Sequence, residues 1–399
     1  MKRTLLLFLL VFSCGLAFSL DFGLLADQAF EAENDLTTYT PALAPWLSWD
    51  GGGRLSVYFS GVFSFKYSKS GDGDSGNGGW RDPALLPELS LFALTYRASD
   101  NFSLEAGRVN YADALGVTAS GLFDGIRFSV SGPNYGSLSA GAYYSGLQYK
   151  ETAEIIMTGD DMIHYSQPWS TDESGSYFAS RRLFAALRWD AALGELNALS
   201  AEALFQFDLN DTVDTLHSQY GEILAEFFPR YMMRISAGAF FEVMERSDGD
   251  ASAAFGALAG FRMDLPGAMN HGINLATQYS SGSWNDNFSA FTPISSHTQG
   301  MVFPGTFSGL WIFSAEYSAR LFQALFGECS LRYFAKTYEE SGDEGQLYGG
   351  ELWASLAWQP LNDVRLIFGG GVFIPGTGNY YPADTDPLWK ISAGLSLSF

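Results

Sequence analysis

The feature that most constrains this chain is an alternation of apolar and polar residues with a period of two. In residues 388–399 one parity is apolar and the other is polar or small. The same pattern returns in residues 54–67, 199–209, 230–242 and 311–321. Because successive side chains of a strand point to opposite faces, each segment predicts a strand with one apolar and one polar face. Such strands suit a β-sandwich or a transmembrane β-barrel.

The amino terminus indicates the compartment. A basic start at residues 1–3, an apolar run over 5–12 and a small-residue site at 17–19 predict a secretory signal peptide, residues 1–19. A second interpretation is a lipoprotein cleavage site with Cys14 lipidated. No later apolar run approaches the roughly 20 residues that a membrane-spanning helix needs, so any membrane crossing must use strands.

The composition limits the partners of the chain. Without Lys2 and Arg3, 20 basic residues stand against 44 acidic ones, which excludes nucleic acid and anionic lipid surfaces as partners. Once Cys14 has left with the signal peptide, Cys329 is alone and forms no intrachain disulfide. The 33 Phe, 20 Tyr and 10 Trp residues are enough for the aromatic girdles at the two edges of a membrane-spanning barrel.

Short and long connections alternate along the sequence. Short turns are expected at residues 50–53, 99–101, 132–134, 192–194, 228–229, 266–267, 322–323 and 360–362. Longer polar connections are expected at 31–39, 69–83, 112–120, 151–177, 209–216, 246–250, 283–304, 339–346 and 375–386. A soluble sandwich has no reason to segregate its connections in this way. We therefore predict an all-β fold, a single transmembrane antiparallel β-barrel formed by residues 20–399, with eighteen strands or, as the alternative, sixteen.

A barrel of this size encloses a lumen too wide for its wall side chains to fill. Only the loops 151–177 and 283–304 are long enough to fold inward. Assigning the polar parity to the lumen predicts these pore-lining residues: Arg54, Arg108, Arg127, Arg182, Arg188, Arg230, Arg234, Arg262, Arg320, Arg332, Arg365, Lys390, Glu105, Glu202, Glu226, Glu242, Glu316, Glu328 and Glu351. Arginine clusters there would favour anions. The alternative is that neighbouring arginines and glutamates pair across strands and hold the wall rigid without preference.

Two short stretches resemble the alginate-export family of outer-membrane porins. The first joins Gly107-Arg108 to Phe123-Asp124-Gly125, and the second ends in Phe373-Ile374-Pro375-Gly376. The resemblance implies an eighteen-stranded export barrel with an electropositive lumen. It assigns Arg108 and Arg127 to that lumen, with Asp124 as their structural partner.

The carboxy-terminal strand resembles the signal by which outer-membrane barrels are recognised for assembly. Its last residue, Phe399, is aromatic. This resemblance implies the barrel-assembly machinery and outer-membrane lipid as partners, and the outer membrane of a diderm bacterium as the location.

Three functions are compatible with such a barrel. The leading hypothesis is a passive outer-membrane channel for small hydrophilic solutes, with anions favoured where arginines cluster. The second is a surface platform whose long acidic loops bind a ligand. The third is a barrel enzyme using Asp160, Asp161 and His164, but acidic loop residues are usually only solvated. The histidines lack metal-ligand spacing, so we expect no metal, no cofactor and no enzyme activity.

Overall fold

The protein forms a closed antiparallel sheet of 18 strands in a computed structural model, with each strand paired to its neighbours along the chain. The structure describes residues 19–70, 84–133, 135–169, 174–194, 196–247, 249, 251–267, 269–284, 287–338, 345–377 and 380–399. The predicted signal peptide lies outside these residues, apart from Ser19. No helix of the described chain is long and apolar enough to cross a membrane.

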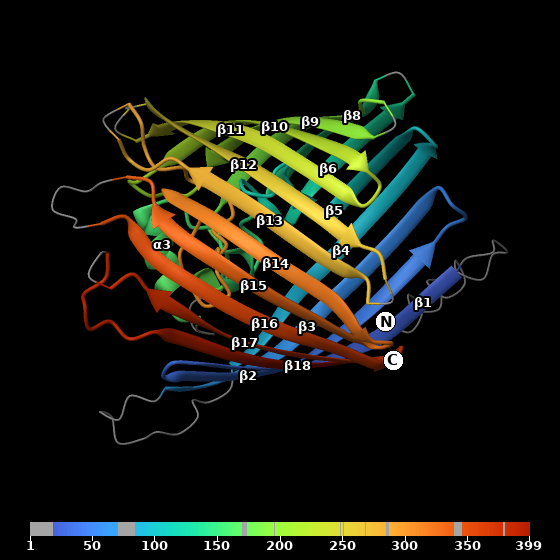
Figure 1. The fold of residues 1–399 in the computed structure, drawn as a ribbon. Coiled ribbons are helices and arrows are strands. Elements are labelled where there is room, and N and C mark those ends of the chain that lie inside the picture. The colour runs from blue at the N-terminus through green and yellow to red at the C-terminus, as the bar shows by residue number, and fades with distance from the viewer. Residues whose placement is uncertain are drawn as a thin grey trace.

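The strands run in chain order around the barrel (Figure 1). They are β1 (Ser19–Glu33), β2 (Leu36–Asp50), β3 (Leu55–Ser70), β4 (Ala84–Ser99), β5 (Phe102–Ala112), β6 (Ser120–Gly132), β7 (Gly136–Tyr144), β8 (Arg182–Ala192), β9 (Asn197–Asp208), β10 (Leu216–Arg230), β11 (Met233–Arg246), β12 (Ala251–Leu265), β13 (His271–Ser280), β14 (Leu310–Phe322), β15 (Leu325–Lys336), β16 (Leu347–Leu361), β17 (Val364–Pro375) and β18 (Leu388–Ser398). The connection between β7 and β8 contains helices α2 (Lys150–Ala153) and α3 (Gly159–Ser166) and the 3₁₀ helix η1 (Ser174–Ser176).

The first and last strands close the barrel. β1 pairs with β18 from Leu25↔Ser398 to Glu33↔Lys390. The backbone of Phe399 extends this ladder, because its N–H donates to the carbonyl of Leu24 and its carbonyl accepts from the N–H of Leu24. The prediction of eighteen strands in one closed barrel is confirmed, and sixteen strands and a two-sheet sandwich are wrong.

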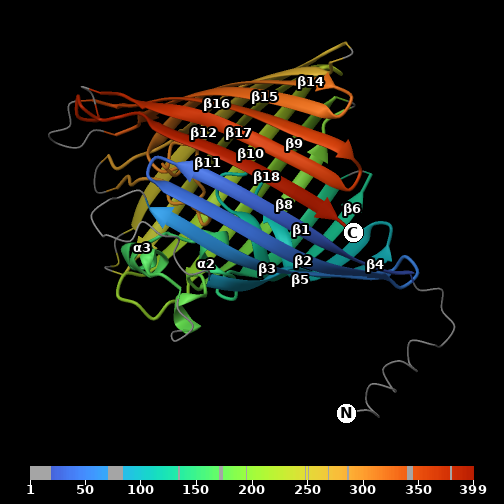
Figure 2. The ribbon, with the colours of Figure 1, turned by 90° about the horizontal axis from the view of Figure 1, so that it is seen from below.

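The connections of the described chain segregate as predicted, with two corrections, and most of the predicted loops 69–83 and 339–346 lies outside the described residues. Long connections gather at one end of the barrel and the carboxy terminus lies at the other (Figures 1 and 2). The predicted long loop at 31–39 is instead a tight turn at residues 34–35, because both flanking strands continue to its edge. The predicted turn at 228–229 lies inside β10, where the register shifts between Phe227 and Arg230, and the chain reverses at residues 231–232.

Successive side chains of each strand point alternately out of and into the barrel. The barrel therefore has an apolar outer face and a separate inner face. In β9 the outward Phe205 and Phe207 are exposed, whereas the inward Leu204 and Gln206 are buried. Cys329 lies on the outer face and is exposed. An outer surface rich in exposed Phe, Leu and Trp is what lipid would cover, since water-soluble proteins rarely expose a large contiguous apolar surface.

The core lies inside the barrel rather than between two sheets. Its apolar cluster combines inward wall residues such as Phe184 and Phe334 with loop residues such as Ile155, Ile294 and Phe303. These loop residues come from the two longest connections. The longest loops therefore fold inward, as their length predicts.

Candidate functional site

Three connections narrow the interior of the barrel, and they define the candidate site. They are loop 113–119 between β5 and β6, loop 145–181 between β7 and β8, and loop 281–309 between β13 and β14. Each is attached to inward-facing side chains of strands that are distant in the sequence. The attachments are mostly carboxylates of the wall that accept backbone N–H groups of the loops.

Loop 113–119 is shaped by its own first residue. The Asp113 carboxylate accepts from the backbone N–H groups of Leu115, Val117, Thr118 and Ala119 at 2.8–3.1 Å. This concentration of donors around one carboxylate fixes the tight curl of the loop, because each bond satisfies a backbone group that the curl leaves without a partner.

Two wall carboxylates then hold the curled loop against β9 and β10. Glu202 accepts from the Tyr111 hydroxyl at 2.5 Å and from the N–H of Ala114 at 2.7 Å. Glu222 accepts from the Thr118 hydroxyl at 2.5 Å. Both glutamates are nearly fully buried, so their carboxyl groups face the loop rather than open solvent.

Loop 281–309 is held at two points far apart on the wall. On β11, Glu242 accepts from the N–H of Thr292 at 2.9 Å. On β16, Glu351 accepts from three successive N–H groups, those of Met301 at 2.9 Å and of Val302 and Phe303 at 2.8 Å.

Aromatic packing strengthens the attachment of loop 281–309 near Glu351. The Phe303 ring stacks on Phe334 of β15 with centroids 4.3 Å apart and contacts Phe373 of β17 at 5.1 Å. The loop is therefore fixed by charge-assisted hydrogen bonds and by ring contacts at the same place.

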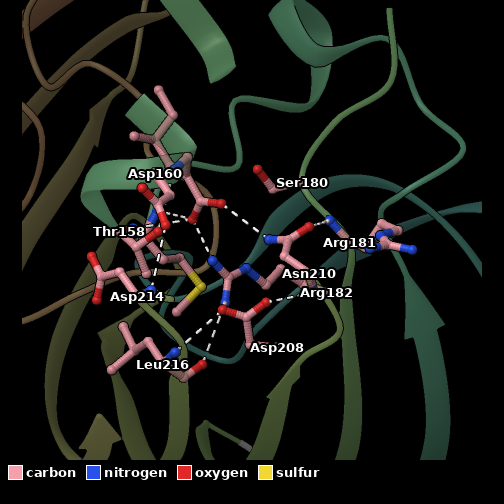
Figure 3. Close-up of polar contacts among 12 residues, drawn as sticks. Thr158, Asp160, Ser180, Arg181, Arg182, Asp208, Asn210, Asp214 and Leu216 are labelled. Atoms are coloured by element: carbon pink, nitrogen blue, oxygen red, sulfur yellow. Dashed lines mark hydrogen bonds and ion pairs between the residues drawn. The ribbon is translucent and has the colours of Figure 1, made fainter. Parts of the chain in front are cut away.

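Loop 145–181 is anchored by a buried arginine (Figure 3). The Arg182 guanidinium, fully buried at the start of β8, forms ion pairs with Asp161 of α3 and Asp208 of β9. Asp161 also accepts from the N–H groups of Met157 and Thr158 at 2.9 and 3.0 Å, while the Thr158 hydroxyl accepts from the N–H of Asp161. This reciprocal arrangement is a capping box, and it fixes the start of α3.

The other end of α3 is held by a buried lysine. The Lys150 ammonium donates to the carbonyls of His164 and Gln167 at 2.8 and 2.5 Å, where the helix leaves its last carbonyls without partners. Burial lowers the pKa of Lys150. Helix α3 is thus pinned at both ends inside the mouth of the barrel.

A cavity of about 380 Å³ lies at this mouth, between α3 and the connection from β9 to β10. Asp160, His164 and Arg181 contribute to its lining. Two members of the cluster considered for an enzyme have partners in the fold: Asp161 forms an ion pair with Arg182, and the His164 Nε2 lies 2.7 Å from the Phe178 carbonyl oxygen. No group of three or more metal-ligating side chains occurs in the described parts of the chain.

Most of the predicted wall arginines pair with acidic neighbours. Arg127 pairs with Glu105, Arg188 with Asp190 at 2.9 Å, Arg234 with Glu226 at 3.4 Å, Arg262 with Asp264 at 3.2 Å, and Arg332 with Glu316 at 3.4 Å and Glu351 at 3.6 Å. Lys390 of β18 reaches Glu31 and Glu33 of β1 at 3.5 and 3.7 Å across the closing seam. Arg127, Arg234 and Arg332 thus pair with glutamates of neighbouring strands, as the pairing alternative expects, whereas Arg188 and Arg262 pair with aspartates of their own strands.

The prediction that Arg108 lines the pore is wrong. Its strand parity is opposite to that of Glu105, and its side chain, 4% exposed, fills a seam between β4 and β5. These strands pair only from Phe92↔Arg108 to Ser99↔Phe102, which leaves the start of β4 without ladder partners on that side. Arg108 bonds the carbonyls of Leu89 and Leu147 there and forms an ion pair with Asp124 at 2.8 Å. The expected Asp124 partnership is confirmed for Arg108 but is wrong for Arg127, which pairs with Glu105.

Gly107 makes this seam possible. It has a φ of +123°, and a Cβ at this position would lie 2.0 Å from the carbonyl oxygen of Phe92. Only glycine fits this close approach without strain. The Gly107-Arg108 motif therefore has a structural role in this barrel.

Other predicted lumen residues need smaller corrections. Arg182, Glu202, Glu242 and Glu351 face inward but are buried beneath the loops, so they do not line open solvent. Arg54 lies in the turn before β3, and Arg230, Arg320 and Arg365 lie near the short-turn ends of their strands. Glu328 faces the interior from β15, opposite Ser318 and Ser355.

Sequence reasoning missed the residues that shape the loops. Asp113 is the clearest case, because it looks like any acidic residue after a strand. Its only signal is local: an aspartate at the start of a short loop is well placed to accept nearby backbone N–H groups.

The fold is shared with known porins. Chains similar over their whole length include OccK5 (OpdH) of Pseudomonas aeruginosa, with a TM-score of 0.62, 10% identity, and coverage of 96% of this chain and 98% of that one. OpdK of P. aeruginosa, solved with vanillate, has a TM-score of 0.62 at 13% identity, again covering 96% and 98%. OccAB1 of Acinetobacter baumannii has a TM-score of 0.60 at 12% identity, covering 95% and 96%. No protein-family model and no curated protein matches the sequence, so this likeness concerns the fold.

Proposed function

We propose that this protein is a passive channel of a bacterial outer membrane for small hydrophilic solutes, with a preference for organic anions. The observation that carries the proposal is a closed 18-stranded barrel whose interior is narrowed, from the long-loop end, by loops fixed to its wall. Fixed inward loops give a wide barrel a selective constriction, whereas loops serving only as an external platform would have no reason to be anchored inside.

We base the proposed preference for anions on which charged side chains of the wall remain exposed to solvent. Glu202 and Glu351 have side chains that are 0% exposed and accept hydrogen bonds from loop groups. Arg188 and Arg127 keep 30% and 36% of their side chains exposed. Arg188 and Arg127 therefore remain within reach of a passing anion, beside Asp190 and Glu105, which keep 38% and 24% of their side chains exposed.

The structural neighbours support a small carboxylate as the solute. OpdK was solved with vanillate, and OccK2 (OpdF) of P. aeruginosa, with a TM-score of 0.58 at 13% identity, was solved with glucuronate; that likeness covers 96% of this chain and 98% of that one. Both are compact organic anions. The inward loops favour such solutes over a polymer such as alginate, which needs a wide continuous path.

The location and assembly of the protein follow the same proposal. The exposed apolar outer face fits the outer membrane, and a barrel-assembly machinery would act on the last strand, where Phe399 completes the pairing with β1. Residues 1–19 would direct export and be removed.

Reversal potentials in a salt gradient test the proposed selectivity. Wild-type protein in planar bilayers should show discrete conductance steps and a reversal potential on the anion side. Arg127→Ser should shift that potential toward cations, since it leaves the partly exposed Glu105 carboxylate without its partner. Folded protein that never conducts refutes the channel, and conduction with an unshifted potential in the variant refutes the role of Arg127.

A further inference from the structure

One histidine joins all three inward loops. His297, in loop 281–309, places its Nδ1 atom 2.5 Å from a carboxylate oxygen of Glu154 in loop 145–181. Its Nε2 atom lies 3.0 Å from the carbonyl oxygen of Ser120, where loop 113–119 ends and β6 begins. The neighbouring Ser296 adds two bonds to the same region, from its N–H to the Glu154 carbonyl and from its hydroxyl to the Ile156 carbonyl.

The geometry at His297 requires a particular protonation state. A backbone carbonyl only accepts hydrogen bonds, so Nε2 must carry a proton to bond Ser120. A carboxylate at 2.5 Å likewise accepts, so Nδ1 must carry a proton to bond Glu154. Only the imidazolium form carries both protons. Neutral histidine can keep one of these bonds and must turn a lone pair toward the other oxygen.

We propose that His297, Glu154 and Ser120 form a proton-operated latch that holds loop 281–309 in the constriction and loosens it as the imidazole loses its proton. The proposal rests on the channel function proposed above. It gives the channel a second property, a gating equilibrium set by external pH, because the latch lies on the long-loop side of the barrel.

The surroundings of His297 favour its charged form. The bond to Glu154 raises the pKa of His297 above its ordinary value of 6.5, partial burial opposes this rise, and the Ser120 carbonyl adds to it. Two further titratable or charged groups, Tyr165 and Arg332, lie near this contact. Burial, and after it the Glu154 charge, raises the pKa of Tyr165 in α3. Arg332 of β15 donates to the carbonyl of Gln299 at 3.3 Å, two residues after the histidine. Arg332 is a cation, but its own acidic partners Glu316 and Glu351 offset it.

The direction of the pH effect follows from this raised pKa. Stabilisation of the latched loop is complete below the pKa of the free imidazole and is lost as pH rises through the higher pKa of the latched form. Between these two values, the ratio of latched to released loop falls up to tenfold per pH unit. The remaining hydrogen bonds, such as those of Ser296, keep the loop near the wall. Release of the latch therefore appears as rapid fluctuation of the channel current rather than as permanent opening of the channel.

Single-channel recordings at about pH 5.5 and about pH 8.5, on either side of the ordinary histidine pKa, test the latch. The wild-type channel should show few current transitions at the lower pH, and the rate of these transitions should rise several-fold at the higher pH. His297→Gln, which cannot be charged, should fluctuate at both pH values. Glu154→Gln should move the midpoint of the transition to lower pH. His271→Gln, which alters a histidine next to the short turn after β12, is the matched control and should behave as wild type.

Two results overturn the latch while leaving the channel intact. One is a wild-type channel whose fluctuations do not change across this pH range. The other is a His297→Gln variant that keeps the wild-type pH dependence. Absence of conductance in every folded variant would refute the channel proposal instead.

Discussion

Replacing Glu351 by alanine should release the tip of loop 281–309 while leaving the barrel intact. Glu351 is 1% exposed and accepts the N–H groups of Met301, Val302 and Phe303 at 2.8–2.9 Å. Hydrogen bonds to a charged group contribute about 1.5–3 kcal/mol each, but the three share one carboxylate and water can replace part of them. We expect a combined loss of at least about 3 kcal/mol, which lowers the docking equilibrium of the loop roughly a hundredfold.

Amide hydrogen exchange measures this release directly. In Glu351→Ala, the amides of residues 301–303 should exchange about a hundredfold faster, because their protection comes from the docked state. Single-channel current should become larger or noisier in the same variant. Glu328→Ala is the control, since Glu328 also faces the interior from β15 but no described loop N–H bonds it. Unchanged exchange at residues 301–303, or equal acceleration in both variants, would refute the anchoring role of Glu351.

Other predictions concern the buried arginine, the outer face and the charged wall. Arg182→Met should lower the free energy of unfolding by about 3–5 kcal/mol, measured by urea titration, because it leaves the buried carboxylates of Asp161 and Asp208 unpaired; a loss under about 1 kcal/mol would contradict the buried network. Leu356→Arg on the outer face should lower stability in lipid vesicles by about 2–4 kcal/mol, whereas an unchanged midpoint would place that face in water. Arg188→Gln should reduce anion preference in reversal-potential measurements, and an increase would contradict a basic constriction.

The strand framework could be predicted because its cause is local. Alternation with a period of two and turn residues at regular intervals carry the fold in the sequence itself. The exception at residues 31–39 has a physical reason. Inward-facing strand residues of a barrel are often polar, so the acidic and threonine-rich edges of β1 and β2 look the same as a loop.

The constriction could be predicted only in part, because it depends on contacts between distant segments. Loop length correctly indicated that the two longest connections fold inward, but the expectation that only they do so is wrong, because the short loop 113–119 also folds inward and is held by Glu202 and Glu222. Nothing local distinguishes Glu351, which anchors a loop, from Glu316, which stays partly exposed on the wall. The same holds for Arg182 and Arg188, which share one parity of β8 although only the first is fully buried.

Arg108 shows a different limit of sequence reasoning. Strand parity is read from an unbroken ladder, and here the pairing of β4 with β5 ends at Arg108 itself. The residue before it, Gly107, has a positive φ, which is the one local sign of an irregular wall. The Gly107-Arg108 motif resembles one that carries a lumen arginine in the alginate-export family, but in this protein its arginine fills a seam between two strands.

The central claim is that a closed barrel conducts through a path narrowed by its own loops. The most direct test compares single-channel conductance of the wild type with that of a variant in which residues 287–304 are replaced by a short glycine-serine link. The account predicts small, discrete, anion-preferring steps for the wild type and larger steps with weaker selectivity for the shortened variant. Equal conductance and selectivity in both, with both barrels folded, would contradict it.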